Sequence, residues 1–265
     1  MLFAGYAATC LCRGHCRRMA PFAFGIRVPS RVDIVAPHGI AEALGTRELS
    51  PMTQEVVLLV HGYGAHWVML EPLRRALQRQ GFRALSWRYG SLRGSIETHA
   101  ARLAAKAKEL DQDSGIERLH FVGHSMGAIV VRSALAMAQP KKLGRVVLLA
   151  PPNRGARLAD LALRLFGRRL VAATELCSDP DSYVNRLTPV SDLDCGIIAA
   201  SWDHVVSPAS TCLAGQRDHI VLRSLHMVPL HRHAPAQVGH FLRQGRFLRE
   251  PADFPLAGMN RRPLT

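Results

Sequence analysis

The chain has 265 residues, of which 48% are hydrophobic and 20% are charged. This length suits one large domain or two small ones, and the composition is that of a globular protein with a buried core. It excludes a largely disordered chain, a collagen-like repeat and a small disulfide-held module, and no apolar stretch reaches the roughly 20 residues that span a bilayer. The formal net charge of +14 favours anionic partners: lipid headgroups, acidic substrates or, without sequence specificity, nucleic acid. The alternative is that the charge reflects only a general preference for arginine in the sequence.

The two ends of the chain lack the periodicity of regular structure. We expect residues 1–51 to form a loosely ordered extension and residues 251–265 a tail, so that residues 52–250 form the domain. In the extension, positive charges follow the first uncharged residues instead of preceding them. A secretory signal has the opposite order, so the cytoplasm is the default expectation.

A group of residue types that bind metals also lies in the extension: Cys10, Cys12, His15 and Cys16. Structural zinc sites draw their four ligands from two such groups. No second group completes this one, and we therefore expect no metal site there.

From Glu55 onward, apolar runs alternate with stretches of helical periodicity. Residues 56–60 are wholly apolar and largely β-branched, as in a strand that is buried on both faces. In chain order we expect strands at 56–60, 83–87, 119–122, 145–150, 195–200 and 219–222, and helices at 67–80, 95–110, 126–138 and 236–243, with Ser95 as an N-cap. Strands that alternate with helices form βαβ units, so the expected fold class is α/β, with a doubly wound, mostly parallel sheet.

The region of residues 156–194 interrupts this alternation. Four large apolar residues there have helical spacing, and four arginines surround them: Leu158, Leu161, Leu165 and Phe166, with Arg157, Arg164, Arg168 and Arg169. Such a basic amphipathic helix has two interpretations. Either its apolar stripe packs on the core of the domain, or the segment is a short helical cap that covers a pocket or settles on an anionic membrane surface.

The strongest chemical signal is Gly123-His124-Ser125-Met126-Gly127, between an expected strand and an expected helix. A serine on such a sharp turn exposes its hydroxyl, and small residues are needed on both sides because the backbone is strained and closely approached. Gly123 and Gly127 meet this need. We therefore expect Ser125 to be a nucleophile; the alternative, a serine that caps the helix, does not require the second glycine.

A glycine-rich segment, His61-Gly62-Tyr63-Gly64, follows the first strand. Acyl transfer at a serine needs N–H donors aimed at the oxyanion of the tetrahedral intermediate. In this layout one donor is the amide of the residue after the nucleophile, Met126, and the other comes from a loop after an earlier strand, for which Tyr63 is the candidate. The alternative is that the segment forms only a tight turn.

Together these segments resemble the α/β-hydrolase superfamily, and more narrowly its small bacterial esterases and lipases of the triacylglycerol-lipase type. The resemblance covers residues 55–245 and rests on the two glycine motifs and on the sequence of residues 150–155, Ala-Pro-Pro-Asn-Arg-Gly. It implies a serine, an acid and a histidine in that chain order. Asp203, in a segment similar to the family's Asp-x-x-Val, is then the acid, and His226, after the last strand, is the base.

Other residues compete for these two roles. Asp218 is the main alternative acid, although it precedes a strand instead of following one. Asp192 and Asp194 also precede their strand and fit less well. The other histidines downstream are expected to be solvated or held in the core: His219, His231, His233 and His240.

The resemblance implies a serine hydrolase that cleaves carboxylic esters of apolar acyl chains through an acyl-enzyme, without a metal or organic cofactor. The expected partners are a small-molecule or lipid ester and, peripherally, an anionic membrane surface. The same residues would serve an acyltransferase or a thioesterase, and a hydrolase-fold binding protein with a silent site is the alternative outside catalysis. Only 6% of the residues are aromatic and no nucleic-acid-binding module is recognisable, so we expect no specific nucleic-acid partner.

Overall fold

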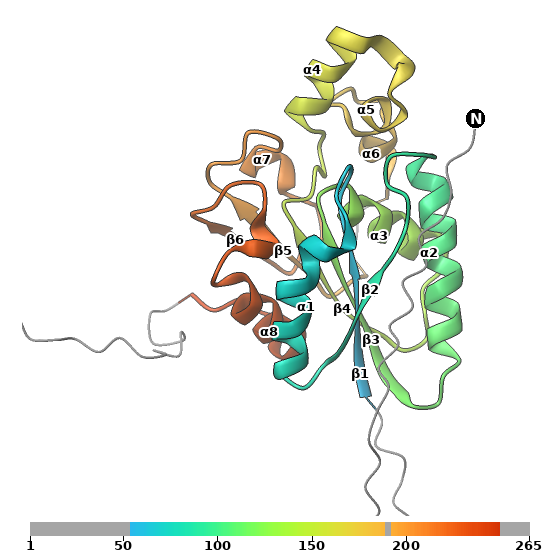
Figure 1. The fold of residues 1–265 in the computed structure, drawn as a ribbon, viewed down its shortest axis with the longest axis vertical. Coiled ribbons are helices and arrows are strands. Elements are labelled where there is room, and N and C mark those ends of the chain that lie inside the picture. Colours follow the sequence, from blue (N-terminus) through green and yellow to red (C-terminus); the bar gives the residue numbers. More distant parts are fainter. Residues whose placement is uncertain (1–53, 189–191, 250–265) are drawn as a thin grey trace, which may run out of the picture. The chain divides into compact units, whose positions relative to one another are not determined.

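The computed structural model describes residues 54–188 and 192–249, which contain a six-stranded sheet with helices on both faces (Figure 1). The strand order is β2-β1-β3-β4-β5-β6, and every neighbouring pair is parallel. The expected α/β class with a parallel sheet is therefore confirmed. The predicted extension, tail and cysteine cluster lie outside the described residues.

The strands and long helices expected from the sequence are all present, with ends that differ by a few residues. The strands are β1 (Gln54–Val60), β2 (Arg83–Trp87), β3 (Ile116–His124), β4 (Leu143–Leu149), β5 (Cys195–Ala200) and β6 (Asp218–Leu222). The sheet is flanked by α1 (Glu71–Arg79), α2 (Ile96–Asp111), α3 (Met126–Met137) and α8 (Ala234–Gln244). Shorter helices are α4 (Arg157–Phe166), α5 (Val171–Leu176), α6 (Tyr183–Arg186) and α7 (Pro208–Thr211), with 3-10 turns η1 (Trp67–Leu70), η2 (Gly167–Arg169) and η3 (Val228–Leu230).

Two helix starts show how local sequence sets these bounds. The Ser95 hydroxyl accepts a 3.1 Å hydrogen bond from the Thr98 amide, so its predicted role as the N-cap of α2 is confirmed. Residues 67–70, expected as the first turn of an α-helix, instead form η1. Pro72 explains the difference, because proline favours the first turn of an α-helix and α1 therefore begins at Glu71.

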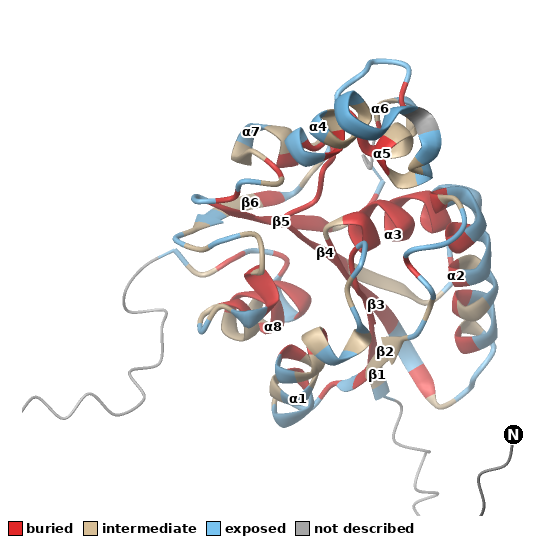
Figure 2. Ribbon diagram, turned by 45° about the horizontal axis from the view of Figure 1, so that its top comes forward, coloured by how far each residue is buried: buried red, intermediate tan, exposed pale blue. Residues whose placement is uncertain are grey.

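Side chains of the central strands alternate between two buried layers. Val56, Leu58 and Val60 of β1 pack with α2 and α3, whereas Val57 and Leu59 pack with α1 and α8. Figure 2 shows that the central strands are coloured as buried along much of their length, between α1 and α8 on one side and α2 and α3 on the other. A strand segment covered on both faces has no solvent-facing positions, which is why residues 56–60 of β1 are an unbroken apolar run in the sequence.

Helices α4, α5 and α6 lie between β4 and β5 in the chain, beyond the carboxyl ends of the strands (Figure 1). Helix α4 contacts the core through Ala159, Ala162 and Leu163. Its four other large apolar side chains, by contrast, are exposed: Leu158, Leu161, Leu165 and Phe166. The interpretation that this apolar stripe packs on the core is therefore wrong, because the alanine side of the helix makes the close approach instead.

A helix that crosses a membrane must be both long and apolar, and the helices of residues 54–188 and 192–249 fall short of this.

Candidate active site

Ser125 occupies the turn between β3 and α3 in a conformation that is rare for a residue with a side chain. Its backbone angles are φ 53° and ψ −126°, and such strain persists only where the surroundings fix it. A Cβ at position 123 would lie 2.5 Å from the Ala128 Cα, and one at position 127 would collide with the His61 carbonyl oxygen. Both flanking glycines are therefore required by close backbone contacts. The Ser125 hydroxyl makes no capping hydrogen bond to α3, so the capping alternative is wrong.

The Ser125 hydroxyl forms one end of a hydrogen-bonded chain of three side chains. Its Oγ lies 2.9 Å from Nε2 of His226, and Nδ1 of His226 lies 2.7 Å from Oδ2 of Asp203. Ser125 follows β3, Asp203 follows β5 and His226 follows β6. Because parallel strands end at the same edge of a sheet, the three residues meet there although they are distant in sequence.

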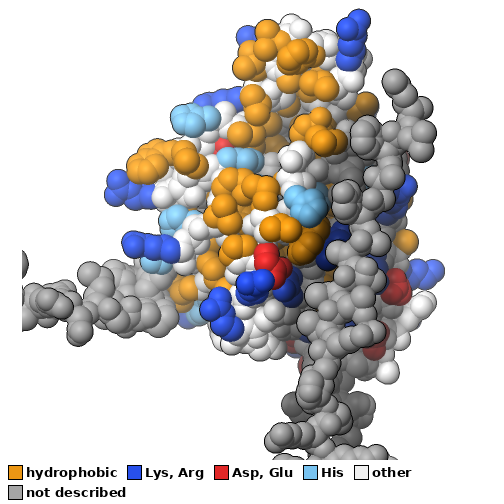
Figure 3. All heavy atoms as spheres, in the orientation of Figure 1, with side chains coloured by type: hydrophobic (Ala, Val, Ile, Leu, Met, Phe, Trp, Pro, Cys, Tyr) orange, Lys and Arg blue, Asp and Glu red, His pale blue; other side chains and the backbone are white. Residues whose placement is uncertain are grey.

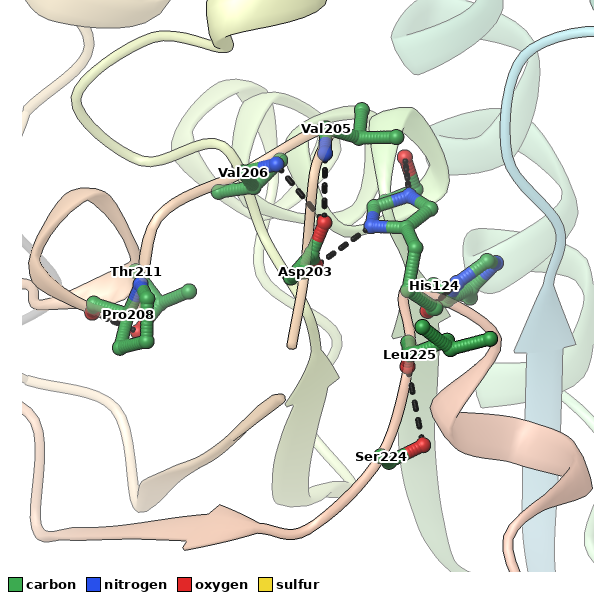
Figure 4. A network of polar contacts seen from close by, with 10 residues as sticks. His124, Asp203, Val205, Val206, Pro208, Thr211, Ser224 and Leu225 are labelled. Carbon is green, nitrogen blue, oxygen red and sulfur yellow. Dashed lines mark hydrogen bonds and ion pairs between the residues drawn. The ribbon is translucent and has the colours of Figure 1, made fainter. Parts of the chain in front are cut away.

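Asp203 is a buried carboxylate with several donors around it. Its Oδ1 accepts hydrogen bonds from the amides of Val205 (2.8 Å) and Val206 (2.9 Å), as Figure 4 shows. Burial alone raises the pKa of a carboxyl group, but the hydrogen bonds from His226 and the two amides outweigh it, so the pKa of Asp203 lies below its ordinary value. The ionised carboxylate can only accept, which assigns a proton to Nδ1 of His226 and leaves Nε2 of the neutral ring to accept from the Ser125 hydroxyl.

Two backbone amides near Ser125 have no hydrogen-bond partner within the described part of the chain. One belongs to Met126, the first residue of α3, and the other to Tyr63, in the loop after β1. This loop runs directly against the serine, because a Cβ at Gly62 would lie only 2.9 Å from the Ser125 Cβ. Both amides that the sequence suggests as oxyanion donors are thus free to bind an acceptor.

Two further residues, to which the sequence interpretation gives no role, position these groups. Nε2 of the buried His124 donates a 3.0 Å hydrogen bond to the carbonyl of His226, and burial, with a smaller effect of the nearby His226 ring, lowers the pKa of His124 to about 4, so its ring is neutral at pH 7. Figure 4 shows His124 beside the loop that carries Leu225. The Tyr89 hydroxyl donates a 2.6 Å hydrogen bond to the carbonyl of His61, just before the Tyr63 loop. His124 has a sequence signal only as the residue before Ser125, and Tyr89 has none.

An apolar pocket of about 280 Å³ opens at the Ser125 hydroxyl. Besides Ser125, Tyr63 and His226, its lining is aliphatic and comes largely from α4 and α5: Pro152, Ala156, Leu158, Ala159, Ala162, Leu170, Ala172, Ala173, Leu176 and Val205. The pocket therefore suits an apolar group held beside the hydroxyl. Within residues 54–188 and 192–249, the site included, no group of three or more His, Cys, Asp or Glu side chains is placed to hold a metal ion.

Asp218, the alternative acid, lies at the other end of β6 from the His226 loop. Its Oδ2 accepts a 2.8 Å hydrogen bond from the Phe247 amide, and its Oδ1 accepts from the His219 amide and from Arg249. Asp218 thus anchors the segment that follows α8. The other candidates for the acid and the base are also not part of the hydrogen-bonded set of Ser125, His226 and Asp203: Asp192, Asp194, His219, His231, His233 and His240.

Known proteins share this fold. Residues 57–257 match the model of a family described as the Alpha/beta hydrolase family. Among solved structures, the mature lipase BlEst2 of Bacillus licheniformis is similar, with a TM-score of 0.53 and 18% identity over 67% of this chain and 86% of that one. Two others are the esterase Pf2001 of Pyrococcus furiosus (TM-score 0.53, 18% identity, 72% and 83% of the two chains) and lipase B of Aspergillus fumigatus (TM-score 0.59, 13% identity, 72% and 52%). No protein with a curated description matches the sequence.

Proposed function

This chain belongs to the alpha/beta hydrolase family, and on that premise we propose that it is a serine esterase that cleaves carboxylic esters with an apolar acyl group. The observation that carries the proposal is the hydrogen-bonded chain from Asp203 through His226 to Ser125, whose hydroxyl faces an apolar pocket. The fold shared with solved lipases and an esterase supports the same class of reaction.

The proposed reaction begins at the Ser125 hydroxyl. As its Oγ attacks the ester carbonyl carbon, Nε2 of His226 takes the hydroxyl proton. The tetrahedral intermediate then collapses: the bond to the alcohol oxygen breaks, His226 returns its proton to that oxygen, and the acyl group stays on Ser125. A water molecule, deprotonated by His226, attacks the acyl-enzyme and releases the carboxylic acid, which restores the serine.

The surrounding groups favour the charged states along this path. Asp203 holds the His226 ring in the tautomer with a proton on Nδ1 and stabilises the imidazolium when it forms. The amides of Tyr63 and Met126 would donate to the oxyanion of the intermediate, where the loss of one such donor typically costs about 3–4 kcal/mol.

The pocket supports an apolar acyl group as the part of the substrate that is recognised. Its five alanines leave room for a chain that larger side chains would exclude, and no carboxylate or arginine among the described residues lines it. An acyltransferase or thioesterase would use the same residues. Added alcohol separates hydrolysis from acyl transfer, because an acyltransferase would form a new ester with the alcohol.

The test is a series of p-nitrophenyl esters from acetate to octanoate, with wild-type protein and the Ser125→Ala variant. We expect kcat/KM to rise with acyl length until the pocket is filled, and to fall by about 10⁴-fold or more at every length in Ser125→Ala. The melting temperature of the variant should match wild type. A folded Ser125→Ala variant that keeps wild-type turnover would overturn the proposal.

A further inference from the structure

Helix α4 exposes four of its five large apolar side chains and turns Ala159, Ala162 and Leu163 toward the body of the domain. Leu158, Leu161 and Leu165 recur at the spacing of one helix face and are 52%, 49% and 66% exposed. Ala159, Ala162 and Leu163 contact the core instead. Burial of large apolar side chains is the main driving force for packing a helix, so this reversed arrangement indicates that the leucines meet something outside the described chain.

The exposed apolar surface continues beyond the helix. Phe166 and Val171 are also at least half exposed, and five of the thirteen exposed large apolar side chains of the described residues fall between positions 158 and 171. Figure 3 shows hydrophobic side chains concentrated over the α4 region, at the top of the view. Such a concentration marks an interaction surface. We call it the α4 face and define it by five residues: Leu158, Leu161, Leu165, Phe166 and Val171.

Arginines border the α4 face. Arg157 and Arg164 are both exposed and are seven residues apart, so they lie on the same side of the leucine ridge, and Arg169 follows in η2. The one carboxylate of α4, Asp160, accepts 2.7 Å hydrogen bonds from the amide and the hydroxyl of Ser178. Three arginines against this one carboxylate leave the border with a net positive charge, like the chain as a whole, whose formal net charge is +14.

The α4 face leads to the pocket at Ser125. Leu158 belongs to both surfaces, and Ala162 and Leu170, which neighbour the face in the chain, also line the pocket. An apolar chain in contact with the α4 face would therefore have a short path to the serine hydroxyl.

We propose that the α4 face binds an anionic lipid surface. A helix with an apolar ridge beside arginines lies in the interface of a lipid layer, with the ridge in the acyl region and the arginines among the headgroups. If Ser125 cleaves esters as proposed, its substrate would be a lipid of that layer, and this part of the inference rests on the proposed function. The binding itself does not depend on catalysis.

The charge pattern favours lipid over a second copy of this chain. In a two-fold contact each residue meets the same patch of the other copy, so Arg157 and Arg164 would approach the same arginines across the interface. Like charges brought together at low dielectric repel. An anionic headgroup layer supplies the opposite charge to every arginine at once.

The test is co-sedimentation with vesicles, in the Ser125→Ala background so that the lipid is not hydrolysed. The vesicles contain phosphatidylcholine alone or with 30% phosphatidylglycerol. We expect binding to the anionic vesicles to be at least about tenfold stronger than to the neutral ones, and to weaken with salt. Two double variants should each bind the anionic vesicles about tenfold or more weakly: Leu161→Ser/Leu165→Ser and Arg157→Glu/Arg164→Glu. The leucine variant leaves the pocket lining intact.

Matched controls lie away from α4. Met137→Ser removes an exposed apolar side chain at the end of α3, and Arg102→Glu/Lys108→Glu makes the same change in net charge on the exposed side of α2. Both should bind as the parent does. Equal binding by the α4 and control variants would overturn the inference, as would a parent protein that does not bind. The inference would also be overturned if the parent protein sediments as a dimer and the Leu161→Ser/Leu165→Ser variant sediments as a monomer.

The two proposals fail separately. Loss of vesicle binding together with unchanged turnover of soluble p-nitrophenyl esters would contradict the lipid surface alone. Vesicle binding by a protein that hydrolyses no ester would contradict the proposed reaction alone.

Discussion

Nδ1 of His226 lies 2.7 Å from Oδ2 of Asp203, although the two residues follow different strands of the sheet. Replacing this carboxylate with an amide removes the charge that stabilises the imidazolium and no longer selects the working tautomer. We expect Asp203→Asn to lower kcat by about 10³–10⁴-fold, measured with p-nitrophenyl butyrate.

Asp218→Asn is the matched control for that change. Asp218 holds the Phe247 amide and Arg249 and does not contact His226. We expect kcat within about twofold of wild type and a free energy of unfolding lower by about 1–3 kcal/mol, measured by urea denaturation. The reverse result, with activity lost only in Asp218→Asn, would assign the acid to Asp218.

Gly62 sets how closely the loop after β1 approaches the serine. A Cβ at this position would lie 2.9 Å from the Ser125 Cβ and 3.2 Å from the His124 carbonyl oxygen. Gly62→Ala should displace the Tyr63 amide or the serine and lower kcat by about 10²-fold, since small displacements of reacting groups have effects of this size. Gly90→Ala, where a Cβ meets nothing within 4 Å, should be neutral; equal loss of activity in both variants would show that the effect is not local.

Ala162 lines the pocket from α4. A phenylalanine there would occupy space that we assign to the acyl chain, so Ala162→Phe should lower kcat/KM for octanoate by about tenfold or more while acetate is affected little. The measurement is the ratio of the two rates. Ala105→Phe, at an exposed position on α2, is the control, and an unchanged ratio in Ala162→Phe would place the acyl chain elsewhere.

His120 makes stability depend on pH. Burial, with smaller contributions from Arg145 and Arg118, lowers its pKa to about 4, from 6.5 in an unfolded chain. The unfolded state therefore takes up a proton between pH 6.5 and 4 that the folded state does not, so about 3 kcal/mol of stability present above pH 6.5 is lost as the pH falls to 4. Urea denaturation across this range should show a shallower pH dependence in His120→Gln than in wild type, and identical slopes would contradict the assignment.

The parts of the fold that could be predicted are those with a strong local cause. The run of residues 56–60 is apolar because both of its faces are covered, and Ser125 could be placed on a sharp turn because only glycine fits on either side. The sequence places Asp203 after an expected strand and Asp218 at the start of one. This difference favoured Asp203 as the partner of His226, which is the pairing in the structure.

Other features depend on contacts between distant segments and leave little trace in the sequence. The hydrogen bond from His124 to the His226 carbonyl joins residues 102 positions apart. The periodicity of α4 identifies a leucine side and an alanine side but not which one faces inward. That choice follows from how closely the helix approaches the domain, and here the alanine side is the buried one.

The proposed reaction requires that the Ser125 hydroxyl is a nucleophile activated by His226. A fluorophosphonate reacts only with such an activated serine, and mass spectrometry of the digested protein locates the adduct. We expect one adduct, on Ser125, that is absent in Ser125→Ala and forms about 10³-fold or more slowly in His226→Ala. An unlabelled wild-type protein, or an adduct that persists in Ser125→Ala, would contradict the proposed reaction.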